Sequence, residues 1–312
     1  MALHSLPPFR FALLLVLLSP MAVLATPREI HHTLGTTTLE TPVQRLVTLY
    51  QGATDTAVAL GIEPVGVVES WSEKPLYRYL RDELDDPRLL GLETQPDLEG
   101  IAWLHPDLIV GARHRHHDVY PLLSRLAPTL MQGDVFDFRG SLELMAKATG
   151  RAERGRQILS CWDARVADFR QRAAARLGDA WPPTVALLSF RGDHARIYYD
   201  GFARRVLDEL GFEVPIDHQK DGWGIKLTTH ESIPAMDGET VFIFMEDDPA
   251  VERTYREWTG HPLWQRLAAV RSDQVYRVDP VTWNMGGGIL AANRMLDDLY
   301  RHYGLAGAPL SC

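Results

Sequence analysis

A single long segment in the middle of the chain constrains the fold more than any other feature. Residues 151–177 contain no proline, and their apolar residues recur every three or four positions, at Ile158, Trp162, Val166, Phe169, Ala173 and Leu177. This spacing predicts an amphipathic α-helix of about seven turns, with arginines on its polar face. Such a helix could be an ordinary surface helix of one domain, but its central position favours a rigid connector between two halves.

Each half of the chain alternates short β-rich runs with helical patterns. In the first half the β-rich runs are Arg45–Tyr50, Pro64–Ser70 and Asp107–Gly111, and the helical patterns are Thr54–Leu60, Pro75–Leu84 and Asp118–Leu126. In the second half the series comprises Thr184–Arg191, Gly201–Leu210, Glu239–Glu246, Pro262–Val270, Gln274–Asp279 and Gly287–Tyr303. Alternation of this kind is typical of α/β domains. We therefore predict two α/β lobes, residues 26–150 and 179–312, joined by one long backbone helix at 151–178.

The first 25 residues have the pattern of a secretory signal peptide. They hold one basic residue, Arg10, no acidic residue, an apolar run over Phe11–Leu18, and small residues at Val23 and Ala25. We therefore expect cleavage after Ala25 and export of the rest of the chain. No later stretch approaches the roughly 18 apolar residues of a membrane span, and no cysteine near the cleavage point could carry a lipid. A soluble protein of a Gram-negative periplasm fits these features best.

The net charge of the chain argues against a nucleic-acid partner. The formal net charge is −9 at pH 7, whereas affinity for nucleic acid depends on basic residues that neutralise phosphates. A small ligand is compatible with this charge, because its site can be locally basic. We expect a monomer that does not bind nucleic acid.

The chain has two cysteines, Cys161 within the long helical segment and Cys312 at its last position. They could pair in an oxidising compartment. Because one lies in the middle of a helix and the other is the final residue, we expect no structural disulfide.

A short pattern occurs once in each half. Residues 97–101 (DLEGI) precede the strand predicted at 108–110, and residues 229–233 (THESI) precede the one predicted at 241–244. Both patterns place a glutamate, Glu99 or Glu231, in the first turn of a short helix, where the helix dipole stabilises a carboxylate. Either glutamate alone would be an unremarkable helix-start residue. Equivalent positions in two matching lobes favour a symmetric pair that faces one partner.

Several motifs follow one another in a specific order along nearly all of the chain after residue 25. They are Thr41–Val47, Ala59–Gly66, Gly91, Pro96–Glu99, Leu104–Ile109, Leu126–Thr129, Pro262–Trp264, Thr282–Trp283, Gly286–Gly288 and Ala291–Ala292. In this order and spacing the chain resembles the helical-backbone class of periplasmic solute-binding proteins. The resemblance is closest to the ferric-dicitrate and ferric-hydroxamate-siderophore members of that class.

The resemblance implies a carrier rather than an enzyme. It implies that the two lobes clasp an iron(III)-siderophore complex in the cleft between them, with no further cofactor and no metal bound directly by the protein. It also implies that Glu99 and Glu231 meet arginines on the membrane permease subunits of an ABC importer, a contact for which carboxylate–arginine pairs are geometrically suited.

The chemistry of such a ligand indicates which residues to look for. Its iron is already saturated with oxygen ligands, so the protein need only grip the outside of the complex. Arginine suits carboxylate or hydroxamate oxygens, and tryptophan or tyrosine suits the organic skeleton. In α/β lobes these residues are expected in loops that follow strands.

In the first lobe, Arg115 and His116 follow a predicted strand and match an Arg-His pair of the dicitrate-type pattern. Arg113, in the same loop, could contact ligand or be solvated. Three further candidates follow two other strands and could line the cleft or pack locally: Tyr50, Gln51 and Trp71.

In the second lobe, Arg191 ends a predicted strand and matches an arginine of the dicitrate-type pattern. Tyr198 lies on the next strand, where it could be a core residue instead. Trp223, between two glycines, matches a tryptophan of the hydroxamate-type pattern, and Trp283 matches an aromatic position of both. For these two tryptophans we expect ligand contact.

The sequence departs from the hydroxamate-type pattern at Glu93, where that family has an arginine that grips the ligand. A carboxylate at this position is expected to repel an anionic complex. The siderophore therefore cannot be named from the sequence.

Two other functions compete with this prediction. A haem, metal or cobalamin carrier of the same architecture could use His114, His116 and His117, although adjacent histidines in one loop do not readily converge on one ion. An exported hydrolase is the other alternative, but the chain lacks a Gly-x-Ser-x-Gly elbow and a His-Glu-x-x-His zinc helix.

Overall fold

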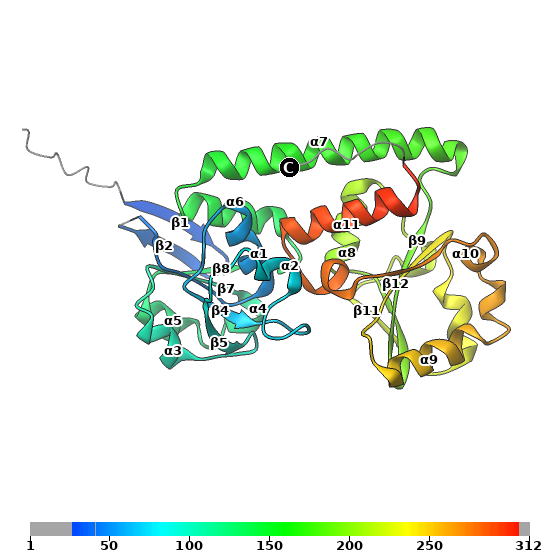
Figure 1. Cartoon of the computed structure of the whole chain (residues 1–312), viewed down its shortest axis with the longest axis horizontal. Coiled ribbons are helices and arrows are strands. Elements are labelled where there is room, and N and C mark those ends of the chain that lie inside the picture. Colours follow the sequence, from blue (N-terminus) through cyan, green and yellow to red (C-terminus); the bar gives the residue numbers. More distant parts are fainter. Residues whose placement is uncertain (1–26, 41, 306–312) are drawn as a thin grey trace, which may run out of the picture.

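The computed structural model describes residues 27–40 and 42–305. The predicted signal peptide and Cys312 lie outside these residues. Two mixed α/β lobes hang from one long helix, α7 (Ala152–Leu177), as Figure 1 shows. This arrangement confirms the predicted fold class. No helix within the described ranges has the length and apolarity needed to cross a bilayer.

The N-terminal lobe is built on a six-stranded sheet with the order β6-β5-β4-β3-β7-β8. Its strands are β3 (Leu46–Thr48), β4 (Gly66–Glu69), β5 (Arg88–Leu92), β6 (Gln95–Pro96), β7 (Leu108–Ala112) and β8 (Thr129–Gln132), and a hairpin of β1 (Arg28–His32) and β2 (Gly35–Leu39) precedes them. Its helices are α1 (Gln51–Ala59), α2 (Arg78–Arg81), α3 (Leu98–Trp103), α4 (Arg113–His116), α5 (Tyr120–Leu126) and α6 (Phe138–Ala148). Within the six-stranded sheet, all strand pairs are parallel except β5–β6. The central strands β3 and β7 are buried throughout, as expected of a parallel sheet covered on both faces.

The C-terminal lobe is built on a five-stranded sheet with the order β11-β10-β9-β12-β13. Its strands are β9 (Val185–Arg191), β10 (His194–Tyr198), β11 (Gly224–Leu227), β12 (Thr240–Phe244) and β13 (Val275–Val278). Its helices are α8 (Phe202–Leu210), α9 (Pro249–Thr259), α10 (Ala268–Arg271) and α11 (Ile289–His302), with short turns of 3₁₀ helix at 178–180, 216–218, 230–236 and 264–266 and of π helix at 281–285. Strands β9, β12 and β13 are parallel, whereas β10 and β11 run antiparallel to their neighbours.

The long helix α7 buries one face against both lobes. The buried positions include Ile158, Trp162, Phe169 and Ala173, in the spacing that the sequence predicts. At 1.5 Å per residue, its 26 residues span about 39 Å. Trp162 packs edge-on against Phe138 of α6, with ring centroids 5.5 Å apart. The helix is therefore part of a continuous core rather than a free rod.

The last helix, α11, ties the two lobes together. Figure 1 shows it beneath α7 and between the lobes. Its first backbone N–H groups, from Leu290 and Ala291, donate to the carboxylate of Asp55 on α1 at 2.9 and 3.0 Å. Because Asp55 belongs to the N-terminal lobe, it caps a helix of the C-terminal segment across the molecule. Burial raises the pKa of this carboxyl to about 6, against the opposing effect of these hydrogen bonds.

Cys161 is disulfide-bonded, so the prediction of no structural disulfide was wrong. The only other cysteine in the sequence is Cys312, which lies outside the described residues. Helix α11 packs along the helix that carries Cys161, and the Tyr300 hydroxyl donates to Asp168 of α7 at 2.5 Å. This long-range packing brings the C-terminal part of the chain to α7, and local sequence patterns do not reveal it.

Candidate ligand-binding cleft

A cleft of about 430 Å³ lies between the two lobes. Its volume falls within the range of about 300–1,000 Å³ that is usual for small-molecule sites. The N-terminal lobe contributes Tyr50, Gln51, Gly52, Trp71, Glu93, Arg115, Val135 and Phe136, and the C-terminal segment contributes Arg191, Glu246, Asn284, Met285, Gly286 and Gly287.

The cleft lies at the carboxyl ends of strands in both lobes. Tyr50, Trp71, Glu93 and Arg115 follow β3, β4, β5 and β7 in turn, while Arg191 ends β9 and Glu246 follows β12. The carboxyl ends of parallel strands meet at one edge of a sheet, which is where α/β folds usually place a ligand. The fold thus brings together five of the candidates chosen from the sequence: Tyr50, Gln51, Trp71, Arg115 and Arg191.

In the N-terminal lobe, an arginine and a glutamate form an ion pair at the wall of the cleft. Arg115 Nε lies 3.1 Å from Glu93 Oε1, and about a third of the Arg115 side chain is exposed. The Arg115 guanidinium also lies over the ring of Trp71, 5.2 Å from its centroid. Burial raises the pKa of Glu93 above its ordinary value, and Arg115 opposes that rise. The arginine therefore presents its charge to the cleft while its partner lies beneath.

The C-terminal lobe repeats this arrangement. Arg191 Nη1 donates to Glu246 Oε1 at 2.8 Å, and both side chains are partly exposed. Although burial disfavours the charge of Arg191, its hydrogen bond to Glu246 raises the pKa of the guanidinium above its ordinary value. Each lobe therefore supplies one arginine that is charged and is held in place by a carboxylate.

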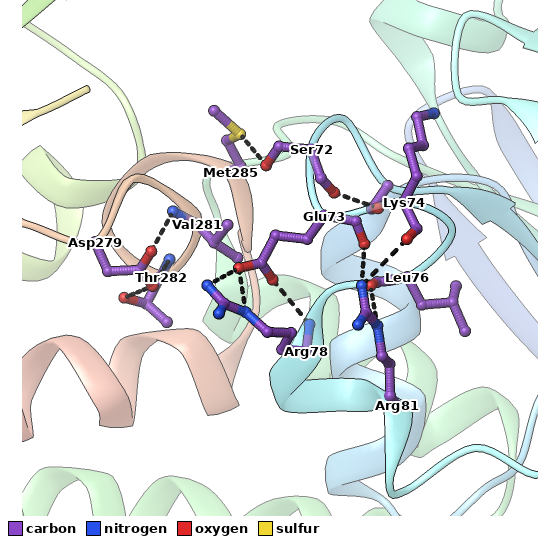
Figure 2. A network of polar contacts seen from close by, with 11 residues as sticks. Ser72, Glu73, Lys74, Leu76, Arg78, Arg81, Asp279, Val281, Thr282 and Met285 are labelled. Atoms are coloured by element: carbon purple, nitrogen blue, oxygen red, sulfur yellow. Dashed lines mark hydrogen bonds and ion pairs between the residues drawn. The ribbon is translucent and has the colours of Figure 1, made fainter. Parts of the chain in front are cut away.

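The loop that carries Trp71 is braced by its own contacts and by the other lobe. Figure 2 shows Glu73 accepting hydrogen bonds from Arg78, whose backbone N lies at 2.9 Å, and Ser72 directed at Met285. The Ser72 hydroxyl lies 3.4 Å from the Met285 sulfur, and Met285 itself lines the cleft. Asp279 closes the turn that carries Met285 by accepting from the backbone N–H groups of Val281 and Thr282. The wall near Trp71 is therefore built from both halves of the chain.

Comparison with known proteins identifies the family. Residues 46–282 match the periplasmic binding protein family. The chain belongs to that family. An achromobactin-binding periplasmic protein of Dickeya dadantii (strain 3937) is 49% identical over 267 residues, which cover 85% of this chain and 88% of that protein. The Fe(3+) dicitrate-binding periplasmic protein FecB of Escherichia coli (strain K12) is 29% identical over 293 residues, 93% of each chain.

The solved structures agree with this assignment. The crystal structure of Staphylococcus aureus SirA complexed with staphyloferrin B superposes with a TM-score of 0.86 and 41% identity. The match covers 89% of this chain and 99% of SirA. This periplasmic binding protein therefore shares its two-lobed architecture with a protein that was crystallised in complex with staphyloferrin B.

Three residues that the sequence assigned to the ligand are buried in this binding protein: Tyr50, His116 and Trp283. Tyr50 lines the cleft, but only 1% of it is exposed, and its hydroxyl lies 2.9 Å from that of Ser141. His116 is fully buried, where its Nδ1 accepts from the Ala112 N–H at 3.0 Å and its Nε2 lies 2.8 Å from the Glu93 carbonyl. Residues 113–116 form a helical turn, in which neighbouring side chains point about 100° apart, so Arg115 and His116 cannot both face the cleft. Burial lowers the pKa of His116, which favours the neutral imidazole.

Trp283 is also fully buried, so the expected ligand contact is corrected to a core position. Its ring packs on Phe242 of β12 with centroids 4.6 Å apart, and its indole N–H donates to Asp298 of α11 at 2.8 Å. The side chain is therefore covered by β12, about 40 positions earlier in the sequence, and by α11, which follows it.

Three further candidates do not line the cleft. Trp223 is 50% exposed, with the Arg196 guanidinium 4.8 Å from its ring centroid. Tyr198 packs between Trp223 and Phe244, with centroid separations of 5.7 and 4.9 Å. Arg113 begins α4 and is exposed. Within the described part of the chain, no three His, Cys, Asp or Glu side chains are grouped so as to hold a metal ion.

Sequence reasoning missed several lining residues. Val135 and Phe136 follow β8, and Glu246 follows β12. The same rule that selected Trp71, a position just after a strand, would have found all three. Asn284 and Met285 lie instead in the π-helical turn at 281–285, for which the sequence carries no comparable signal.

Glu99 and Glu231 both lie on the surface, each near the start of a helical turn. Glu99 is the second residue of α3, whose capping residue Asp97 accepts from the Gly100 N–H at 2.9 Å. Glu231 is the second residue of the 3₁₀ turn at 230–236. A hydrogen bond from its own backbone N–H and one to Thr229 lower the pKa of Glu231. Both side chains are therefore accessible to a partner.

Proposed function

We propose that this periplasmic binding protein carries a ferric siderophore, of the citrate or hydroxamate type, to the permease of an ABC importer. The observation that carries the proposal is the cleft with one charged arginine from each lobe, Arg115 and Arg191. Two guanidinium groups that line one cleft suit an anionic complex, and guanidinium groups bind carboxylate oxygens in a bidentate manner. The relatives named for achromobactin and ferric dicitrate, and the structure with staphyloferrin B, support the same ligand class.

The aromatic side of the cleft supports an organic skeleton around the iron. Trp71 is 46% exposed at the cleft, and Phe136 lines it from the loop after β8. Aromatic faces provide apolar contact area without a requirement for hydrogen bonds. The protein thus grips the outside of a complex whose iron is already coordinated, and no side chain of the cleft needs to bind the metal.

Delivery is the second half of the proposed function. Glu99 and Glu231 are accessible carboxylates, one in each lobe, and we assign them to contacts with arginines of the two permease subunits. In this proposal the chain is exported by its first 25 residues, acts in the periplasm as a monomer and catalyses no reaction.

Tryptophan fluorescence tests the ligand class. The protein should be titrated with a panel of ferric complexes that includes ferric citrate and a ferric trihydroxamate, with Trp71→Phe as a matched variant. We expect saturable quenching by at least one complex and a smaller signal in Trp71→Phe, because Trp71 is the tryptophan that lines the cleft. Absence of quenching by every ferric complex, together with a Soret band after incubation with haem, would replace this proposal with a haem carrier.

A further inference from the structure

Glu93 connects three parts of the cleft wall from beneath. Only 5% of its surface is exposed. Its carboxylate accepts from Arg115 Nε at 3.1 Å, from Trp71 Nε1 at 3.2 Å and from the backbone N–H of Gln51 at 3.4 Å. These three donors belong to three separate segments, and all three residues line the cleft. One carboxylate therefore determines where three parts of the wall lie.

The contact with Glu93 also determines which atoms Arg115 can offer to a ligand. The ion pair uses Nε, and within the described residues no acceptor forms a hydrogen bond with the two terminal nitrogens. Trp71 lies under the same guanidinium, so the group is held from one edge and from one face. The remaining edge, formed by Nη1 and Nη2, is the part that can bind a carboxylate as a fork.

We propose that Glu93 is a positioning residue for ligand binding: it holds Arg115 by Nε and Trp71 by its indole N–H, so that both meet an anionic ferric complex in a fixed geometry. This inference rests on the proposed function. An arginine that is already ordered loses less side-chain freedom when a ligand arrives, which favours binding. The charges of Glu93 and Arg115 largely offset each other, so the pair presents an anion with oriented N–H donors rather than with a net charge.

This inference reverses the interpretation from the sequence, in which Glu93 repels the ligand, and the two predict opposite effects of one substitution. If Glu93 only repels, Glu93→Ala should bind an anionic complex more tightly. If it positions Arg115 and Trp71, Glu93→Ala should bind ferric citrate about tenfold or more weakly, the scale of one lost hydrogen bond to a charged group. Glu93→Gln keeps an acceptor oxygen and should stay within about threefold of the wild type.

A double-mutant cycle shows whether Glu93 acts through Arg115. In an Arg115→Ala background, Glu93→Ala should weaken binding by less than about threefold, because Arg115 is already gone and only the contacts with Trp71 and Gln51 are left to lose. A full tenfold loss in that background would overturn the proposal. Glu69→Gln is the matched control, since Glu69 lies nearby, pairs with Lys74 and does not line the cleft.

A measurement without ligand separates this inference from the proposed function. The indole N–H resonance of Trp71, identified by its loss in Trp71→Phe, should shift in Glu93→Ala and stay unchanged in Glu69→Gln. If no ferric complex binds the wild type, the proposed function fails, and this resonance alone decides whether Glu93 holds Trp71. An unshifted resonance, or an affinity of Glu93→Ala for ferric citrate equal to or above that of the wild type, would overturn the inference.

Discussion

Trp283 lies in the turn before the last helix, and its replacement by alanine tests how that turn is held. The side chain is fully buried between Phe242 of β12 and Asp298 of α11. Removing a buried tryptophan typically costs about 3–5 kcal/mol of the free energy of unfolding, from lost apolar burial and the cavity left behind. With an entropy of unfolding of about 2.1 cal/mol/K per residue, we expect the melting temperature of a chain of this length to fall by about 5–8 °C.

Trp223 provides the matched control, because the sequence analysis predicts ligand contact for both tryptophans. Its side chain is half exposed and contacts the Arg196 guanidinium, 4.8 Å from the ring centroid, and the ring of Tyr198, with centroids 5.7 Å apart. Trp223→Ala should therefore cost about 1 kcal/mol or less. Trp283→Phe is an intermediate case: it keeps an aromatic ring, loses the hydrogen bond to Asp298, and should cost about 1–3 kcal/mol.

Chemical and thermal unfolding of the ligand-free protein, followed by circular dichroism, measures both effects. From most to least stable, the order should be wild type, Trp223→Ala, Trp283→Phe and Trp283→Ala. Trp283→Phe, which still folds, should bind its ferric complex with wild-type affinity because the side chain does not reach the cleft. A melting temperature of Trp283→Ala within about 2 °C of the wild type would refute the assignment of Trp283 to the core.

Three further predictions concern binding, delivery and pH. Arg115→Ala and Arg191→Ala should each weaken the binding of an anionic ferric complex by about 1.5–3 kcal/mol in a fluorescence titration, and unchanged affinity in both folded variants would remove these arginines from the site. Glu99→Ala combined with Glu231→Ala should leave that affinity intact but reduce iron uptake by cells at limiting protein levels, whereas wild-type uptake would leave them as helix-start residues only. Burial raises the pKa of Asp55 to about 6, above the roughly 3.9 of an unfolded aspartate. The protonated carboxyl therefore contributes most to the free energy of unfolding below pH 4. This contribution should fall by about 3 kcal/mol as the pH rises past 6. Asp55→Asn should remove this part of the pH dependence in denaturation curves measured between pH 4 and 7, and an unchanged slope would contradict it.

The sequence by itself determined the long central helix, the buried central strands and the general place of the site. The apolar spacing of residues 151–177 predicts a helix, and α7 spans Ala152–Leu177. The run at Asp107–Gly111 contains β7 (Leu108–Ala112) almost entirely, since a short continuous apolar run is typical of a buried strand. The rule that ligands lie after parallel strands placed Tyr50, Trp71 and Arg115 at one edge.

Only the tertiary structure decided which side chains face the cleft and what they do there. Arg115 and His116 are neighbours in sequence, yet one lines the cleft and the other is buried, because a helical turn points them in different directions. Trp283 belongs to the core because β12 and α11 pack over it. Glu93 contacts Arg115 and Trp71 directly, and each lies 22 positions away in the sequence. Whether Glu93 strengthens or weakens ligand binding therefore depends on how these distant segments come together. Local sequence sets periodicity, whereas burial and charge pairing arise from contacts between distant residues, which no local pattern encodes.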